Sequence, residues 1–438
     1  MKKTAILLIG IACYLQCLAQ NNKVTSARMH LDEFSSHGDS TELSAAKKSI
    51  DEASVNDKTK DEPKMYLYRG EVYITLFGRQ LNRIISKEMK SGEKNIVKAT
   101  SAAYSKLDTN NLCIAANSFI RVVQLVPSKD AYAQEAIEPT NLPTCAVYLH
   151  NKASCDYNNH NYATSLALSQ KVMIILKLAQ ASDSDYIETV ELAANAAADG
   201  GNTTVAIMYY QRMLDMKFGK AWTYQSLASM YYKQKDSAKA WDYIEKGRAL
   251  FPDDMQLIIS ETNYYITKHN YEKAEGNLML SINKLEQRPD KDKNKNLLAS
   301  LYINLGGIYD HRANPRDDKG TDLPKPADYD TLFVRAETNY NKALDITPDN
   351  FDLLYNMGAL YFNRAVPITK EANELPLNAK AKYDKLMGQA KLYFLKAQPF
   401  FERAYKINPS DPSNTNALIQ LYSSTDQNDK ADAIRSKK

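Results

Sequence analysis

One repeat length dominates this sequence. Three alanines, Ala206, Ala240 and Ala274, follow one another at steps of 34 residues. A bulky side chain stands four residues after each of them, in the order Tyr210, Ile244 and Leu278. A fixed period of about 20 to 50 residues indicates similar supersecondary units, each of which buries its apolar face only against the next. The sequence therefore predicts a repeat stack rather than one globular core.

Other positions keep the same register. We call the repeated alanine of each unit its marker alanine. A proline falls twelve residues after the marker alanines Ala240, Ala336 and Ala397, at Pro252, Pro348 and Pro409. A triplet of a large residue, a small residue and a tyrosine precedes the marker, at Leu227-Ala228-Tyr231, Leu305-Gly306-Tyr309 and Met357-Gly358-Tyr361. Small residues let two helices approach closely, and proline ends a helix because it cannot continue the hydrogen-bond ladder. We therefore expect paired helices with Tyr231 and Tyr309 in the core.

This pattern resembles the tetratricopeptide repeat, a helix–turn–helix unit. The best unit runs from Ala221 to Asp254, "AWTYQSLASMYYKQKDSAKAWDYIEKGRALFPDD". The resemblance implies an all-α fold, an α–α superhelix (a solenoid) of about eight or nine helix–turn–helix repeats. It covers most of the chain.

The repeats are expected in three groups. Residues 20–95 are predicted to form degenerate helical repeats, because their markers are weak. Region 96–288 holds units at 96–129, 146–179, 187–220, 221–254 and 255–288, of which 146–179 carries Ser165 in place of the marker alanine. Region 298–438 holds two expanded units and a truncated one, at 298–350, 351–411 and 412–438.

The first nineteen residues have a different character. Lys2 and Lys3 precede an apolar run that is too short to span a bilayer, and Cys17-Leu18-Ala19 offers small residues where a signal peptidase reads. We expect residues 1–19 to be a cleaved signal peptide, with lipid attachment at Cys13 or Cys17 as the alternative. No later stretch is apolar enough to span a membrane. The protein is therefore predicted to be exported, and either periplasmic or associated with an outer membrane.

Composition and motifs argue against several functions. Charged residues make up 25% of the chain and its net charge is only +4, without a dense basic run, so no nucleic-acid site is expected. We find no glycine-rich nucleotide loop, no zinc-protease helix and no nucleophile elbow. The sequence predicts no enzyme activity and no cofactor.

Cysteine and histidine alternate at steps of five residues at Cys145, His150, Cys155 and His160. These residue types ligate zinc. On an α-helix, however, a step of five turns successive side chains by about 140° from one another, so they cannot converge on one ion. We expect buried cysteines and incidental histidines, and no metal site.

What remains is binding by shape. In proteins with this repeat, the first helices of successive units line a concave groove that receives a peptide or a helix. By register, the residues expected to face that groove are Trp222, Gln225, Ser229, Tyr232, Lys233, Gln256, Ile259 and Asn263. The alternative is a groove that a neighbouring chain segment or solvent fills.

Two units carry insertions between their first and second helices. Compared with a regular unit, the segment from Tyr309 to Ala336 is eighteen residues longer, and that from Tyr361 to Ala397 is twenty-seven longer. The first insertion reads as a loop, and the second as two helical extensions around Pro376 that either kink or break at Pro367 and Pro399. The edge formed by 310–330 and 366–390 either docks a partner or only covers the next repeat.

The function expected from this reading is an exported, non-enzymatic protein-interaction scaffold of a bacterial cell envelope. Its partners would be proteins of a secretion or assembly complex. The alternative is a glycan-binding outer-membrane protein, similar to the starch-binding lipoproteins that use these repeats. Most of the 29 tyrosines fall at core positions of the repeat, which favours a packing role for them over a sugar-binding surface.

Overall fold

The chain folds into helices. The structure, a computed structural model, describes residues 23–288, 291–317 and 320–436. Within these ranges the only β-type pairing is an isolated bridge between Arg316 and Asp322, so the predicted all-α fold is confirmed. None of the helices in the described part of the chain is both long and apolar enough to cross a membrane. The expected signal peptide, 1–19, lies outside the described residues.

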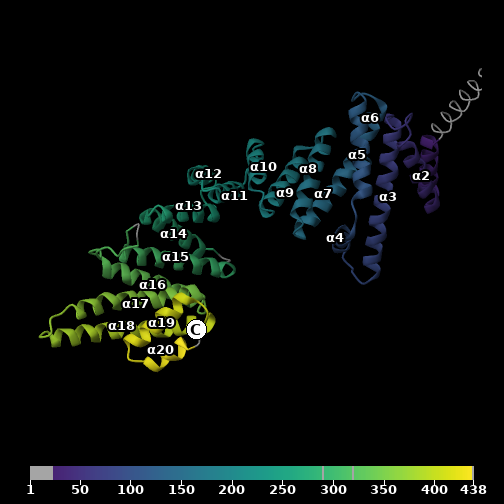
Figure 1. Cartoon of the computed structure of the whole chain (residues 1–438). Helices are drawn as coiled ribbons and strands as arrows, with labels where there is room; N and C mark the ends of the chain where they lie inside the picture. Colours follow the sequence, from purple (N-terminus) through teal and green to yellow (C-terminus); the bar gives the residue numbers. More distant parts are fainter. Residues whose placement is uncertain (1–22, 289–290, 318–319, 437–438) are drawn as a thin grey trace, which may run out of the picture. The chain divides into compact units, whose positions relative to one another are not determined.

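The chain divides into two compact units, Met1–Asp236 and Ser237–Lys438. The division falls inside the expected repeat 221–254, so its two helices belong to different units. Among its described residues, the first unit has a helical segment at 23–37, followed by helices α2 to α11 (Figure 1). These are α2 (Ser40–Ser54), α3 (Pro63–Lys90), α4 (Ile96–Lys106), α5 (Asn110–Leu125), α6 (Ala131–Ala136), α7 (Leu142–Asn158), α8 (Tyr162–Leu178), α9 (Asp183–Asp199), α10 (Thr203–Asp215) and α11 (Ala221–Lys233).

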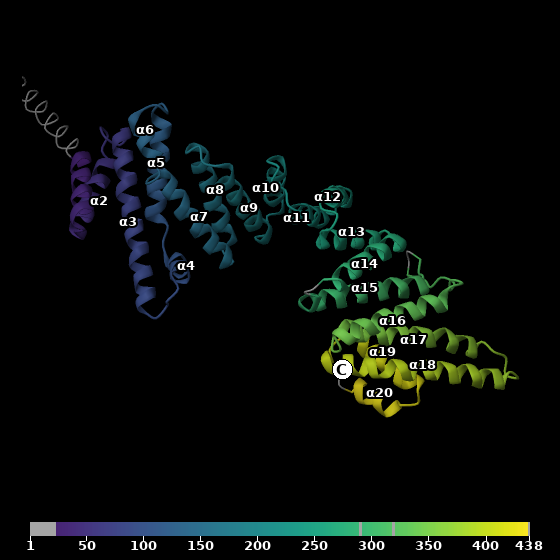
Figure 2. The ribbon, with the colours of Figure 1, turned by 180° about the vertical axis from the view of Figure 1, so that it is seen from behind.

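The second unit consists mainly of antiparallel helix pairs. Its helices are α12 (Ser237–Leu250), α13 (Met255–Thr267), α14 (Tyr271–Glu286), a short 3-10 helix (Lys291–Asn294), α15 (Lys295–Ala313), α16 (Tyr329–Ile346), α17 (Phe351–Asn373), α18 (Lys380–Ile407), α19 (Pro412–Ser424) and α20 (Asn428–Arg435). In both views of the molecule, α17 and α18 reach further than α15 and α16 (Figures 1 and 2). The longest arm of this unit is thus the one that carries the larger insertion.

Local sequence signals set where one helical repeat ends and the next begins. Two residues after each marker proline stands an Asx residue whose side chain accepts a hydrogen bond from the backbone of the next helix. Asp254 caps α13 through Leu257 N at 3.0 Å, Asn350 caps α17 through Leu353 N at 2.9 Å, and Asp411 caps α19 through Asn414 N at 2.7 Å. Proline ends one repeat, and the Asx cap begins the next one. The cap is needed because the first N–H groups of a helix have no partner inside the helix.

Close packing of glycine on an aromatic ring fixes each long hairpin. A Cβ atom placed on Gly306 would lie 2.6 Å from the ring of Tyr340, and one placed on Gly358 would lie 2.6 Å from the ring of Phe401. Both rings are fully buried. These are the small positions that the sequence predicted for close approach, so this part of the prediction is confirmed.

Tyrosine and glutamate link successive hairpins in the second unit. Tyr309 of α15 donates its hydroxyl to Glu275 of α14 at 2.8 Å, and Tyr361 of α17 donates to Glu337 of α16. Tyr422 of α19 donates to Glu402 of α18 at 2.8 Å. Burial raises the pKa of each of these tyrosines, and the bond to the carboxylate raises it further, so they remain protonated donors. The recurring tyrosines therefore hold successive hairpins together.

The interior prolines do not break the arms. α17 is continuous through Pro367, and α18 is continuous through Pro399. Of the two expected outcomes, breakage is wrong, since both helices run on past these prolines, which lie at exposed positions. Ala390, Phe394, Ala397 and Phe401 of α18 are buried.

The first unit departs from the expected boundaries at 96–129. There α4 was expected to be the first helix of a pair with α5, but α5 packs mainly on α3. A Cβ on Gly70 of α3 would lie 2.5 Å from the ring of Phe119 on α5, the same contact as in the other long hairpins. The pair is therefore α3 and α5, and α4 lies within a third insertion, beside the C-terminal half of α3 (Figure 1).

Candidate functional site

The predicted groove residues of the first unit lie on α11. Ser229, Tyr232 and Lys233 are exposed, whereas Trp222 and Gln225 are half-buried. The large side chain with the best access is Tyr232, which is 37% exposed. The neighbouring buried positions Leu227, Ala228 and Tyr231 face the core. One side of α11 thus packs and the other presents polar groups, and that these residues line a binding groove stays a prediction.

Trp222 is partly engaged by packing. Its indole meets the ring of Tyr210 edge-on, with ring centres 5.9 Å apart, and Lys220 Nζ lies 5.9 Å from the indole centre. Lys220 also forms an ion pair with Glu191 of α9 at 3.3 Å. Burial raises the pKa of Tyr210 to about 12, so its hydroxyl stays protonated and donates to Asn195 of α9 at 2.9 Å. α9 and α11, the first helices of successive repeats, are linked by the Lys220–Glu191 ion pair, and we call their exposed polar side the first-helix face.

The other three predicted residues belong to the second unit and lie on α13. Gln256 and Asn263 are exposed. Ile259 is partly buried against the core of that unit, so its side chain is only partly available. Asp254 caps this helix, which fixes where its exposed face begins.

The alternating cysteines and histidines have separate partners. Cys145 is buried and burial raises the pKa of its thiol, while Cys155 Sγ contacts the carbonyl of Ser101 at 3.7 Å. His150 Nδ1 lies 3.2 Å from Thr189 Oγ1, and His160 Nδ1 lies 2.7 Å from the hydroxyl of Tyr162. Over the residues that the structure describes, no group of three or more such side chains could hold a metal ion.

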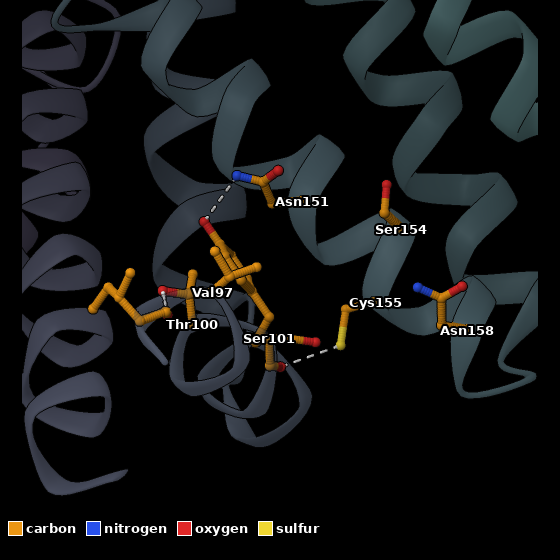
Figure 3. Close-up of a pocket in the computed structure, with 9 residues that line it drawn as sticks. Val97, Thr100, Ser101, Asn151, Ser154, Cys155 and Asn158 are labelled. Atoms are coloured by element: carbon orange, nitrogen blue, oxygen red, sulfur yellow. Dashed lines mark hydrogen bonds between the residues drawn. The ribbon is translucent and has the colours of Figure 1, made fainter. Parts of the chain in front are cut away.

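A hollow of about 310 Å³ lies between α4 and α7 (Figure 3). Asn151 donates to the hydroxyl of Tyr104 at 3.4 Å on one side, and Cys155 contacts Ser101 on the other. Its remaining lining consists of small polar and aliphatic side chains from the two helices. The sequence missed this hollow because nothing in the repeat register places α4 against α7.

The predicted insertion edge is partly closed by packing. Arg364 of α17 places its guanidinium 4.6 Å from the ring centre of Tyr329 and 4.9 Å from that of Phe333, both on α16. It also donates to Asp330 at 2.5 Å. The two expanded hairpins therefore meet at Arg364. A polar hollow of about 950 Å³ lies nearby, where the ends of α14 and α15 face the loop before α16.

A family comparison agrees with the geometry. A family profile described as "TPR repeat" matches residues 335–364, which span the second half of α16 and the start of α17. These residues contain the marker alanine, the proline, the cap and the glycine whose contacts are given above. This chain is a tetratricopeptide-repeat (TPR) protein. No curated protein matches its sequence.

Several solved structures are similar to this TPR protein in fold. The Cut9–Hcn1 hetero-tetramer of the APC/C has a TM-score of 0.40 at 12% identity, covering 86% of this chain and 59% of that one. Part of a TPR protein from Cytophaga hutchinsonii has a TM-score of 0.40 at 15% identity, covering 71% and 95%. YrrB, "a TPR protein with an unusual peptide-binding site", has a TM-score of 0.35 at 16% identity, covering 52% and 97%.

The α7/α8 hairpin of the TPR protein has a polar interior. In α7 the positions of the core leucine and tyrosine hold Lys152 and Asp156, both buried and paired at 2.6 Å. In α8 the marker position holds Ser165, and Ser169 follows one turn later, both fully buried. Asp156 Oδ2 and both serine hydroxyls have no hydrogen-bond partner among the described residues. The missing marker alanine at Ser165 was the signal.

Proposed function

We propose that this TPR protein is an exported, non-enzymatic scaffold of a bacterial cell envelope that binds protein partners. Protein interaction is the general role of the repeat. The observation that carries the proposal is the first-helix face, where α11 presents Ser229, Tyr232 and Lys233 to solvent beside the polar side chains of α9.

The chemistry of this face favours a polar or basic peptide. α9 carries Asp183, Asp185, Glu188, Glu191 and Asp199 and has no basic residue of its own. Lys220 neutralises Glu191, while Glu188 remains exposed. Hydrogen-bonding amides at Asn195 and Gln225 would supply the polar contacts that an extended peptide backbone needs.

In-cell photocrosslinking tests the proposal. A photoreactive amino acid at Ser229 is expected to trap envelope proteins, because that side chain faces the proposed ligand. The same group at Met208 of α10, which is exposed but on a second helix, is the matched control. Equal trapping at both sites, or at neither, would remove the first-helix face as the binding surface.

The same cells test export and the rival function. We expect the mature protein to lack residues 1–19 and to fractionate with the envelope. Retention on immobilised polysaccharides without any trapped protein would favour a glycan-binding function. Trp241 and Tyr264 of the second unit give that alternative little support, because their rings stack on each other, with ring centres 4.0 Å apart.

A further inference from the structure

The long arm of the second unit has an open groove of its own. A hollow of about 580 Å³ runs along one side of the α17/α18 hairpin, and every residue that lines it belongs to one of these two helices. We call it the arm groove. Its lining residues are Arg364, Ile368, Gln389, Leu392, Tyr393, Leu395 and Lys396.

The floor of the arm groove is apolar and open to solvent. Leu392 is 64% exposed and Leu395 is 45% exposed, although both belong to a helix whose opposite stripe is well buried. Gln389, Leu392 and Lys396 follow one another at steps of three and four, so they share one face of α18. Adjacent exposed leucines in a hollow mark an interaction surface more often than scattered single ones do.

The wall of the arm groove is cationic. Arg364 is held in place by the rings of Tyr329, Phe333 and Tyr393, and Lys396 Nζ lies 5.6 Å from the ring centre of Tyr361. Because these rings are rigid, both cations are positioned before any ligand arrives. The lining contains no aspartate or glutamate; Arg364 is paired with Asp330 outside the lining, so the groove keeps a net positive charge through Lys396.

One donor at this wall lacks a partner. Asp330 accepts from Arg364 Nη2 at 2.5 Å. Arg364 Nη1 is buried and, among the described residues, has no hydrogen-bond partner. The Arg364 side chain is 19% exposed, so a ligand carboxylate meets its accessible part, in a charge-assisted contact, and not the enclosed Nη1.

We propose that the arm groove binds an acidic, apolar peptide segment of a partner protein. Apolar side chains of the segment rest on Leu392 and Leu395, and its carboxylates meet Arg364 and Lys396. This assigns a function to the α17/α18 arm, which adjoins the predicted insertion edge, and that function is independent of the first-helix face. Complementary charge steers the segment to the groove, and burial of the leucines holds it there.

Peptide selection on the full chain tests the proposal. Random 16-residue peptides are displayed and selected on the wild-type protein and on the Leu392→Ser/Leu395→Ser variant. Wild type is expected to enrich sequences that combine Asp or Glu with Leu, Ile or Phe, and the variant is expected to lose them. The enriched peptide should bind Lys396→Gln about tenfold more weakly, and more weakly again as salt is raised.

The control is Leu377→Ser, since Leu377 is fully exposed at the turn of the arm, outside the groove. This variant should bind the selected peptide as wild type does. Enrichment of basic or uncharged peptides, or equal enrichment on the double serine variant, would overturn the proposal. So would a wild-type dimer in sedimentation that the double variant abolishes, because a second copy would then be the occupant. Crosslinking at Ser229 should be unchanged in the double variant, which separates this proposal from the first-helix face.

Discussion

Two hairpins of the second unit, α13/α14 and α17/α18, use the same register over different lengths. The shorter one turns over three residues, with His269 in the left-handed region (φ 55°) and Asn270 capping α14. The longer one turns over 374–379. The position of Thr262 in the short hairpin is Gly358 in the long one, and that of Leu278 is Phe401.

This difference shows where a long hairpin gains its stability. Gly358 admits the ring of Phe401 at a distance that any Cβ would prevent, so the base of the arm is tightly packed. Leu392 and Leu395 are exposed on one side of α18, while Phe394 and Ala397 on the other side are buried. The arm therefore combines a packed side that serves stability with an exposed side that is free for binding.

The largest expected effect comes from emptying the base. Phe401→Ala should lower the free energy of unfolding by about 3–5 kcal/mol, because a fully buried ring leaves a cavity. Leu278→Ala at the matching position of the short hairpin should cost about 2–5 kcal/mol. Urea unfolding followed by circular dichroism measures both. A clearly smaller loss for Phe401→Ala than for Leu278→Ala would contradict the comparison.

Filling the base is the next test. Gly358→Ala should destabilise by about 1–3 kcal/mol, since the new Cβ would overlap the ring of Phe401. Gly388→Ala, in α18 of the same hairpin, meets nothing within 4 Å and should stabilise by about 0.5–1 kcal/mol through helix propensity. Thermal unfolding should show a lower melting temperature for Gly358→Ala and a higher one for Gly388→Ala. A change in the same direction for both variants would mean that the close approach of Gly358 to Phe401 does not matter.

The marker alanines test whether both hairpin types share one register. Ala240 and Ala397 are both fully buried, so Ala240→Leu and Ala397→Leu should each cost about 1–3 kcal/mol by overpacking. Melting temperatures give the comparison. A wild-type melting curve for Ala240→Leu would refute the register at the short hairpins alone.

Removing the tyrosine hydroxyl should destabilise the protein more at one inter-hairpin hydrogen bond than at another. Tyr361→Phe removes the hydroxyl that pairs with Glu337, at a cost of about 1 kcal/mol. Tyr309→Phe should cost less, because Glu275 also accepts from Arg312 at 2.7 Å. Chemical unfolding of the two variants, with Tyr383→Phe as an exposed control, measures the difference.

The smallest effect is a pH dependence. Burial acts to raise the pKa of Glu402, but hydrogen bonds from Gln398 and Tyr422 and nearby lysines outweigh it, so the pKa lies below its ordinary value. Its stabilisation is therefore present above the ordinary value near 4.5 and is lost as the pH falls through the lower folded value. Glu402→Gln should flatten the acid side of the stability curve. An unchanged acid limb would show that Glu402 does not contribute.

Sequence reasoning reached the fold through local rules. A proline after each marker alanine, and a small residue before each core tyrosine, act within a few residues of the chain. They are therefore readable from the sequence at Pro252 and Gly358, whereas the cap at Asp254 is a finding of the structure. The glycine at 306 was predicted for close approach, and the partner ring, Tyr340, was found only when the helices could be seen packed.

The pairing of α3 with α5 and the arm groove could not be read in the same way. An insertion that contains a helix removes the fixed spacing between Gly70 and Phe119, so the repeat register alone pairs α4 with α5 instead of α3 with α5. The charge and exposure of the arm groove depend on which side of α18 faces solvent. Arg364 of α17 lies between Phe333 of α16 and Tyr393 of α18. This arrangement is set by tertiary packing and cannot be read from the repeat period.

The polar interior of α7/α8 has a consequence for how the first unit opens. In a repeat array, stability is close to a sum over units and their nearest-neighbour contacts. A hairpin whose centre holds a lysine–aspartate pair and unsatisfied hydroxyls contributes less than its neighbours. Local unfolding should therefore begin between α3/α5 and α9/α10, rather than fraying inward from a terminus. Hydrogen exchange would then divide the first unit into two separately melting blocks.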